Sequence, residues 1–214
     1  KGKSLIFFNK FLGVTLPERS LTSKGLKPAI TIYLRVRRVM EMVLAAIGLI
    51  LSAPLILLIS LAIKLDSEGE IFFRQVRCGQ HGRVFNMCKF RSMVKNAEEI
   101  KKDIKWLNEV DGPMFKITDD PRTTRVGRFL RATNLDELPQ LWNVLWGQIS
   151  LVGPRPLSID EMRLNPRWRD IRLMVPQGIT GLWQIKAHSK VTFNEWIQQD
   201  IDYVLNLSPW LDMK

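Results

Sequence analysis

The sequence predicts an α+β protein, mainly helical, that is monotopic: it attaches to one side of a membrane through a re-entrant helix. The first observation is an apolar run at Val43–Ile63 without a charged residue. Strand-like runs at 71–77 and 83–90 flank a glycine-containing loop of hairpin length, which predicts a small β-hairpin. We therefore divide the chain into a basic lead (1–42), the membrane helix (43–63) and one compact folded domain (64–214).

Basic residues are concentrated in the lead. The 214 residues include 32 Lys and Arg against 21 Asp and Glu, a net charge of +11, and residues 1–42 carry +7 of it. The basic residues of the lead are Lys1, Lys3, Lys10, Arg19, Lys24, Lys27, Arg35, Arg37 and Arg38. Such a surplus predicts a polyanionic partner: nucleic acid, an anionic membrane or phosphorylated substrates. Because the lead directly precedes the apolar run, we interpret it as a juxtamembrane segment attracted to anionic membrane lipids.

The apolar run is long enough to cross a bilayer, for which about 20 apolar residues suffice. Pro54 lies near its middle and cannot donate a backbone hydrogen bond, so we expect the helix to kink or break there. The Ser52 hydroxyl could serve the carbonyls that the break leaves free. Basic residues flank the run on both sides, and both flanks stay cytosolic only if the chain enters and leaves by the same face. We therefore favour a re-entrant helix–break–helix, with a simple kinked span as the alternative.

The remaining chain carries helix signals. A charged amphipathic helix is expected at 97–110, with one side facing solvent or lipid headgroups. Capping boxes that begin at Ser158 and Thr192 predict further helices. Cys78 and Cys88 fit neither a disulfide framework nor a zinc site. Any metal is expected to be a hard cation held by carboxylates and phosphates.

Arginines recur every three residues before an acidic pair. Arg122, Arg125, Arg128 and Arg131 would lie near one side of a helix and form a strip that attracts phosphate. An ordinary solvated helix face is an equal alternative.

Asp136 and Glu137 lie between a candidate N-cap, Thr133 or Asn134, and Pro139, which is tolerated only in a first helical turn. We therefore expect a helix from here to about residue 146, whose positive end would keep both carboxylates ionised. An ionised aspartate can attack phosphorus if a metal and cations neutralise the phosphate. First-turn acids without a catalytic role are the alternative.

Several long motifs occur in order along the chain. They are the proline-interrupted apolar run, IKLDSEGEIFFRQVRCG, KFRSM, TRVGRFLRATNLDELPQLWNVL, SLVGPRP and GITGLWQ. From about Arg35 to its end the chain resembles the monotopic phosphoglycosyl transferases, the bacterial sugar transferase family. The resemblance implies transfer of a sugar-1-phosphate from a UDP-sugar to a polyprenol phosphate such as undecaprenyl phosphate, with release of UMP. This reaction begins the synthesis of an exopolysaccharide, O-antigen or capsule.

The resemblance also implies roles for individual residues. Asp136 would be the nucleophile that forms a phospho-aspartyl intermediate, and Glu137 its partner in holding Mg²⁺. Substrate-binding roles are expected for Lys89, Arg91, Arg128, Arg131, Arg155 and Gln184. Residues 64–214 would form the catalytic domain on the cytosolic face of the bacterial inner membrane.

Some positions depart from the family pattern. Ala53 separates Ser52 from Pro54, and Gln177 and Ala187–His188 replace a common Pro and Gly-Arg, which bears on sugar and nucleotide specificity. The long lead without a Met indicates a longer parent protein.

Two other functions each fit part of the sequence. A basic nucleic-acid-binding module leaves the apolar run unexplained, so we expect no nucleic-acid partner. An NDP-sugar glycosyltransferase would use Asp119 and Asp120 as metal ligands and release UDP, although this pair also fits a turn before Pro121. The sequence is compatible with a monomer and with a homo-oligomer.

Overall fold

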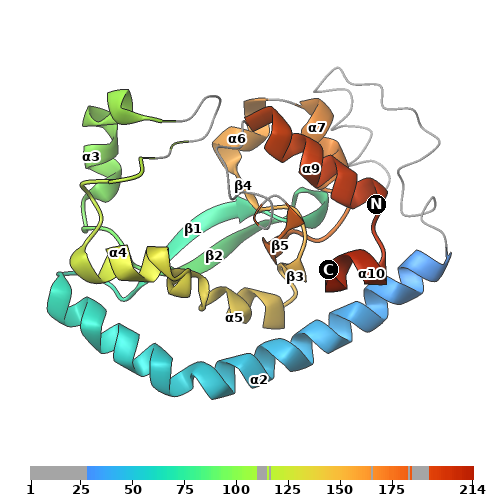
Figure 1. Ribbon diagram of the computed structural model, residues 1–214, viewed down its shortest axis with the longest axis horizontal. Coiled ribbons are helices and arrows are strands. Elements are labelled where there is room, and N and C mark those ends of the chain that lie inside the picture. Colours follow the sequence, from blue (N-terminus) through green and yellow to red (C-terminus); the bar gives the residue numbers. More distant parts are fainter. Residues whose placement is uncertain (1–27, 110–114, 116, 165, 183, 185–192) are drawn as a thin grey trace.

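The computed structural model describes residues 28–109, 115, 117–164, 166–182, 184 and 193–214. One long helix, α2 (Pro28–Asp66), lies beneath the rest of the chain as a bow whose ends turn toward it (Figure 1). Two small sheets stand above α2, and shorter helices surround them (Figure 1). The predicted α+β architecture, mainly helical and with a small hairpin, is confirmed.

The α2 helix continues through Pro54 without a break over 39 residues. Proline leaves the Ile50 carbonyl without its usual helical donor, yet the chain bows instead of ending the helix (Figure 1). The Ser52 hydroxyl donates to the Gly48 carbonyl at 2.6 Å and not to the carbonyl that Pro54 leaves free. The expected break at Ser52 and Pro54 is thus a curved, continuous helix, because a single lost hydrogen bond is absorbed by bending.

One face of α2 is buried along its length and the opposite face is apolar and exposed. Ala45, Ile59 and Ile63 are at most 6% exposed and pack against the domain. On the other face Leu51 is 76% exposed and Leu57 is 71% exposed. The segment Ile32–Asp66 is long and apolar enough to cross a membrane. An exposed apolar surface of this extent indicates contact with lipid or with another protein.

Both ends of α2 contact the same domain. The Asp66 carboxylate accepts a hydrogen bond at 3.0 Å from the Val126 N–H at the start of α4 (Arg125–Ala132). At the other end, the Tyr33 hydroxyl donates to Asp212 of α10 (Pro209–Met213). The helix therefore extends beyond the expected limits of 43–63 on both sides and runs along the domain.

The hairpin forms the larger sheet. β1 (Phe72–Cys78) and β2 (Val84–Phe90) pair antiparallel across η1 (Gln80–Gly82), and β4 (Leu157–Ser158) adds to β1. The second sheet pairs β3 (Ser150–Val152) in parallel with β5 (Gly178–Thr180).

The outer edge of β2 is closed by α5 (Gln140–Leu145). The Asn143 side chain accepts from the Cys88 N–H at 3.0 Å and donates to the Asn86 carbonyl at 2.8 Å. Phe85 and Met87 of β2 are buried in the cluster that also includes Ala45 of α2. The hairpin, α5 and α2 thus share one core.

The remaining helices follow the capping signals in part. The helix expected at 97–110 divides into α3 (Ala97–Asp103) and η2 (Lys105–Leu107). Ser158 and Glu161 form the predicted capping box at α6 (Ile159–Leu164), with reciprocal bonds of 2.7 and 3.2 Å. α7 (Pro166–Arg172) and α9 (Phe193–Leu205) follow. The capping box at Thr192 lies outside the described residues.

Two arginines of the basic lead face the protein and not the lipid. Arg37 is 7% exposed and forms ion pairs with Glu41 at 3.0 Å and with Asp212 at 2.7 Å. Arg38 donates to the last carbonyls of α5. Of the three arginines in the described part of the lead, Arg35 is the exposed one. The expected lipid-facing role is therefore wrong for Arg37, whose guanidinium is enclosed by buried carboxylates.

Arg37→Met is expected to lower the free energy of unfolding by about 3–5 kcal/mol, because Glu41 and Asp212 would remain buried without a counter-charge. Denaturant unfolding in detergent, followed by tryptophan fluorescence, measures this change. The matched control Arg35→Met removes an exposed arginine of the same helix and should change stability by less than about 0.5 kcal/mol. Equal losses in the two variants would contradict the prediction.

Candidate active site

The acidic pair lies on η3 (Leu135–Glu137), a single 3-10 turn between α4 and α5. Asn134 adopts a left-handed conformation with φ 56° and its side chain caps nothing. It follows the last turn of α4 as a terminating residue, a position where asparagine is tolerated. The helix expected from Thr133 or Asn134 to about residue 146 is therefore found in part: a 3-10 turn follows Asn134, whose side chain does not cap it, and the α-helix α5 begins at Gln140 and ends at the expected place.

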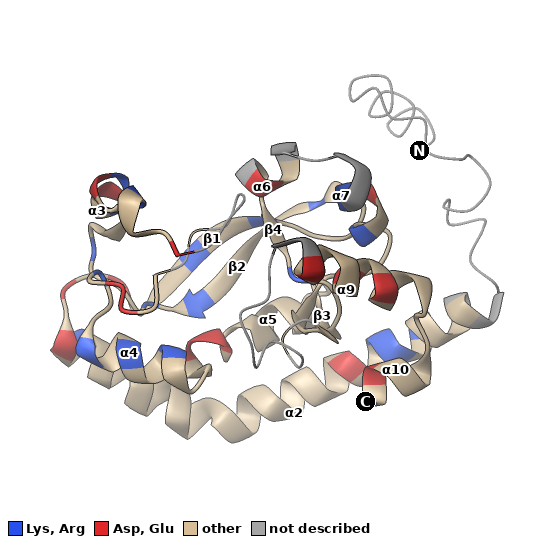
Figure 2. Ribbon diagram, turned by 45° about the horizontal axis from the view of Figure 1, so that its top comes forward, with Lys and Arg blue, Asp and Glu red and all other residues tan. Residues whose placement is uncertain are grey.

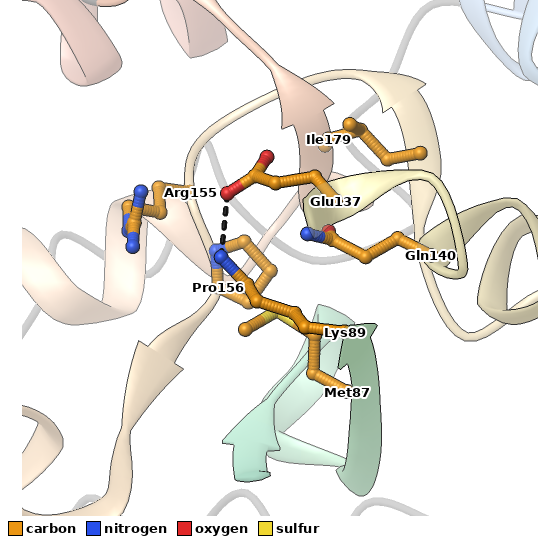
Figure 3. Close-up of a pocket in the computed structure, with 8 residues that line it drawn as sticks. Met87, Lys89, Glu137, Gln140, Arg155, Pro156 and Ile179 are labelled. Atoms are coloured by element: carbon orange, nitrogen blue, oxygen red, sulfur yellow. Dashed lines mark hydrogen bonds and ion pairs between the residues drawn. The ribbon is translucent and has the colours of Figure 1, made fainter. Parts of the chain in front are cut away.

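A pocket opens beside this turn (Figure 3). Its lining includes Lys89 of β2, Glu137 of η3, Gln140 of α5 and Arg155, with apolar walls from Met87 and Ile179. The Lys89 ammonium forms an ion pair with the Glu137 carboxylate at 2.5 Å. Figure 3 shows Arg155 on one side of this ion pair and Gln140 on the other. Two cations, a carboxylate and an amide from four separate segments thus converge on one space.

Asp136 lies beside the pocket and is 8% exposed. Burial raises the pKa of the Asp136 carboxyl above its usual value, and the positive charge of Lys89 partly offsets this shift. The adjacent Glu137 charge also raises it, while Arg131 lowers it. The expectation that a helix end keeps this carboxylate ionised is replaced by a balance between burial and nearby cations.

Lys89 is subject to the opposite forces. Burial lowers the pKa of its ammonium group, as does the neighbouring positive charge of Arg155, while Glu137 and Asp136 raise it. Lys89 and Asp136 therefore each favour the charged form of the other. This coupling places the two groups in one electrostatic unit.

The Gly153–Pro156 turn carries Arg155 to the pocket and is held from behind. Arg172, which is fully buried, donates to the Arg155 carbonyl at 2.9 Å and pairs with Asp200 at 2.7 Å. Burial raises the pKa of Asp200 to about 6 against the lowering effect of Arg172. Gln177, one of the departures from the family pattern, donates to the Arg172 and Val175 carbonyls and so supports the same turn.

Two more buried arginines hold the flanks of this turn. Arg77 of β1 donates to the Pro156 carbonyl at 3.2 Å and pairs with Glu161 at 3.2 Å. Arg37 of α2 donates to the Val152 carbonyl. Guanidinium groups from α2, β1 and α7 thus fix the backbone on either side of Arg155.

The other predicted substrate-binding residues lie apart from the pocket lining. Arg91 is 8% exposed and donates to the Ser67 carbonyl at 2.7 Å and to the Glu68 carbonyl, so it anchors the connection after α2. Arg128 and Arg131 are exposed on α4, and Arg131 donates to Thr123.

Gln184 is partly buried and its backbone N–H donates to the Gly181 carbonyl at 3.0 Å. It is the last described residue before a gap that runs from 185 to 192, the segment that also holds Ala187 and His188.

The expected strip of four arginines is not one surface. Arg122 precedes α4, is 4% exposed, and binds both carboxylate oxygens of Asp120 at 2.9 and 2.6 Å. The remaining three arginines are exposed. Because Asp120 is engaged in this buried pair, it is not a free metal ligand, and Asp119–Asp120 forms part of a turn.

Gln140 is a residue that sequence reasoning missed. It is 2% exposed, lies four residues after Asp136 and lines the pocket. A signal was available, since a glutamine one turn after the acidic pair and between Pro139 and Leu141 is a polar residue among apolar ones. Arg77 and Arg172, by contrast, resemble any surface arginine in the sequence.

Asp136 and Glu137 could bind Mg²⁺ only together with ligands from water and the substrate. Among the described residues, no group of three His, Cys, Asp or Glu side chains is placed to hold a metal. Mg²⁺ is commonly bound by one or two carboxylates together with water and substrate phosphates. Glu137, which lines the pocket, and the adjacent Asp136 match that donor set. A site built from protein ligands alone does not fit.

The family model described as bacterial sugar transferase matches residues 32–214. The galactosyl transferase CpsE of Streptococcus agalactiae is 42% identical over 183 residues, which cover 85% of this chain and 40% of the relative. The undecaprenyl-phosphate galactose phosphotransferase of Salmonella typhimurium is 39% identical over 186 residues, which cover 83% of this chain and 38% of the relative. A UDP-glucose:undecaprenyl-phosphate glucose-1-phosphate transferase of Caulobacter vibrioides is 39% identical over 213 residues, which cover 95% of this chain and 74% of the relative.

The chain spans about two fifths of the length of the first two of these relatives. The family match extends over most of the chain and includes the acidic pair, the Lys89 strand and the Arg155 turn. The chain therefore belongs to the bacterial sugar transferase family.

Proposed function

We propose that the chain transfers a sugar-1-phosphate from a UDP-hexose to undecaprenyl phosphate through a phospho-aspartyl intermediate at Asp136, with release of UMP. The observation that carries the proposal is the buried Asp136–Glu137 turn beside a pocket whose cations are Lys89 and Arg155. Relatives named for galactose and for glucose transfer to this lipid support the substrate class. The reaction would be the first membrane step in the synthesis of an exopolysaccharide, capsule or O-antigen.

In this mechanism Lys89 and Arg155 bind the diphosphate of the donor and neutralise its charge. A carboxylate oxygen of Asp136 attacks the phosphorus that carries the sugar. The bond from that phosphorus to the UMP oxygen breaks, and UMP leaves with the electron pair. A phosphate oxygen of the lipid then attacks the same phosphorus and releases the Asp136 carboxylate. Because the acceptor is already an anion, no general base is required.

Mg²⁺, held by Asp136 and Glu137 together with substrate oxygens, would supply charge neutralisation at the diphosphate. The residues of the chain must also keep Asp136 ionised despite its burial. Lys89 serves this end, since its charge lowers the pKa of Asp136. Lys89 would therefore act twice, on the donor phosphates and on the nucleophile.

The contacts of α2 support a re-entrant attachment to the cytosolic face of the inner membrane. A helix that spans a bilayer separates its two ends by about 30 Å of hydrocarbon. Here Asp66 at one end and Tyr33 at the other both bind one domain. Figure 2 shows the middle of α2 without charged residues, whereas the domain above it carries them. The apolar face would enter the lipid, and exposed basic residues such as Arg35 would contact anionic headgroups.

Wild-type protein incubated with Mg²⁺ and UDP-glucose or UDP-galactose, labelled in the sugar and without acceptor, should retain label covalently and release UMP. Asp136→Asn should retain none because it lacks the nucleophile, and it should remain folded because burial disfavours the charge that it removes. Glu137→Gln is the matched variant and should form the labelled protein more slowly. Label on the Asp136→Asn protein, or UDP as the product, would exclude the proposed mechanism.

The acid limb of the pH profile should depend on Lys89. Activity requires ionised Asp136, so it falls as the pH drops through the pKa of that carboxyl. Because the Lys89 charge lowers this pKa, Lys89→Met should move the limb to higher pH in addition to reducing the rate. Rapid-quench measurement of UMP formation against pH gives the midpoint. Lys101→Met, on α3, is the control and should leave it in place; an unmoved midpoint in Lys89→Met would refute the coupling.

The attachment can be tested with single cysteines at Arg35 and Glu70, which are both exposed and lie on either side of the apolar run at 43–63. Cys88→Ser provides the background, since Cys78 is buried. Both cysteines should be protected from a membrane-impermeant maleimide in spheroplasts and should react after lysis. Labelling of one position in intact spheroplasts would show that α2 spans the membrane.

A further inference from the structure

Gln140 presents a buried amide to the pocket. The residue is 2% exposed, and Figure 3 shows its side-chain amide directed toward the ion pair of Lys89 and Glu137. The amide has no hydrogen-bond partner among the described residues, and it is not one of the fully buried unpaired polar groups, so it faces the open space of the pocket. An amide that faces a pocket and has no partner from the protein can donate and accept hydrogen bonds with a ligand bound there.

The chemistry of the amide distinguishes between parts of the donor. A carboxamide both donates and accepts hydrogen bonds, whereas a phosphate oxygen at neutral pH only accepts. Lys89 and Arg155 already supply cationic donors for phosphate. A hydroxyl group, which donates and accepts, matches Gln140 on both counts. The apolar side chains of Met87 and Ile179 nearby suit the carbon face of a sugar ring.

The place of Gln140 in the pocket indicates which part of the UDP-sugar donor lies next to its amide. The nucleophile and the leaving group lie roughly in line on opposite sides of the phosphorus, so UMP departs away from Asp136. The sugar is attached through one of the oxygens between these two positions. Gln140 begins α5, the helix that follows the acidic turn, and its amide lies on the opposite side of the Lys89–Glu137 ion pair from Arg155 (Figure 3). From there it reaches the sugar more directly than the nucleotide.

We propose that Gln140 binds a hydroxyl group of the transferred sugar and so helps to select which UDP-hexose is used. This inference rests on the proposed function and adds a sugar-binding residue to it. Its neighbours divide the pocket into a phosphate side, with Lys89 and Arg155, and a sugar side.

The test compares a ligand that contains the sugar with one that lacks it. Gln140→Met keeps the approximate volume of the side chain and removes its hydrogen bonds. The KM for UDP-glucose or UDP-galactose, whichever the wild type uses, should rise roughly 10- to 100-fold, because a hydroxyl loses its partner in a buried site. Inhibition by UMP, which has no sugar, should stay within about twofold. Gln198→Met, an exposed glutamine on α9, is the matched control and should change neither value.

Monodeoxy analogues of the donor sugar identify the hydroxyl. One analogue should be a poorer substrate for the wild type by a similar factor, yet lose nothing further in Gln140→Met. Gln140→Glu, which retains an acceptor, provides a second variant if Gln140→Met unfolds at a lower temperature than the wild type.

The outcomes separate the inference from the proposed function. Parallel weakening of UDP-hexose and UMP would place Gln140 at the nucleotide or in a purely structural role and overturn the inference, as would an unchanged KM. Wild-type protein that releases no UMP from any UDP-sugar would overturn the proposed function before a variant is tested.

Discussion

The buried guanidinium of Arg37 is the interaction on which the arrangement of the molecule depends. It lies between Glu41 of its own helix and Asp212 of α10, and it also donates to the Val152 carbonyl just before the turn that carries Arg155. Desolvated charges are tolerated only when they are paired, so these partners must be assembled together. The helix that exposes an apolar face is therefore part of the framework of the site and not a separable anchor.

The same principle recurs behind the pocket. Arg172 with Asp200 and Arg77 with Glu161 are buried pairs that hold the backbone on either side of Arg155. Arg155, which lines the pocket, is thus positioned by two arginines, Arg172 and Arg77, that do not line it. Asp136 sits under the opposite constraint, since its burial favours the protonated form that could not act as a nucleophile. In the proposed mechanism the Asp136 carboxyl must stay charged, which costs stability, and the positive charge of the nearby Lys89 limits that cost.

The position of η3 relates the site to the apolar surface. α4 and α5 flank the acidic turn and both pack on α2 (Figure 1). Phe129 on α4, Trp142 on α5 and Trp146 directly after α5 are also exposed, so both helices next to this turn carry exposed aromatic side chains. The phosphate of the proposed lipid acceptor would approach Asp136 from this apolar side of the molecule. This arrangement suits the proposed reaction, in which a soluble donor and a lipid acceptor meet at one site.

Local patterns were enough to predict the hairpin, the capping box at Ser158 and an apolar helix that includes residues 43–63. Each depends on residues close together in the chain, as does the pairing of Asp136 with Glu137. The motifs also predicted that Lys89 and Arg155 would accompany this pair, and the structure brings all four to one place.

Tertiary packing decided the rest. It kept α2 continuous through Pro54, because the helix is supported along its length, and it placed Asn134 in a turn instead of at a helix start. It also separated the arginines: Arg91 and Arg122 bind the protein itself, whereas Arg155 lines the pocket. By itself, the sequence determined the long apolar helix, the hairpin and the acidic pair. Only the tertiary structure decided which cations serve them, because a guanidinium takes its partner from segments that folding brings together from far apart in the chain.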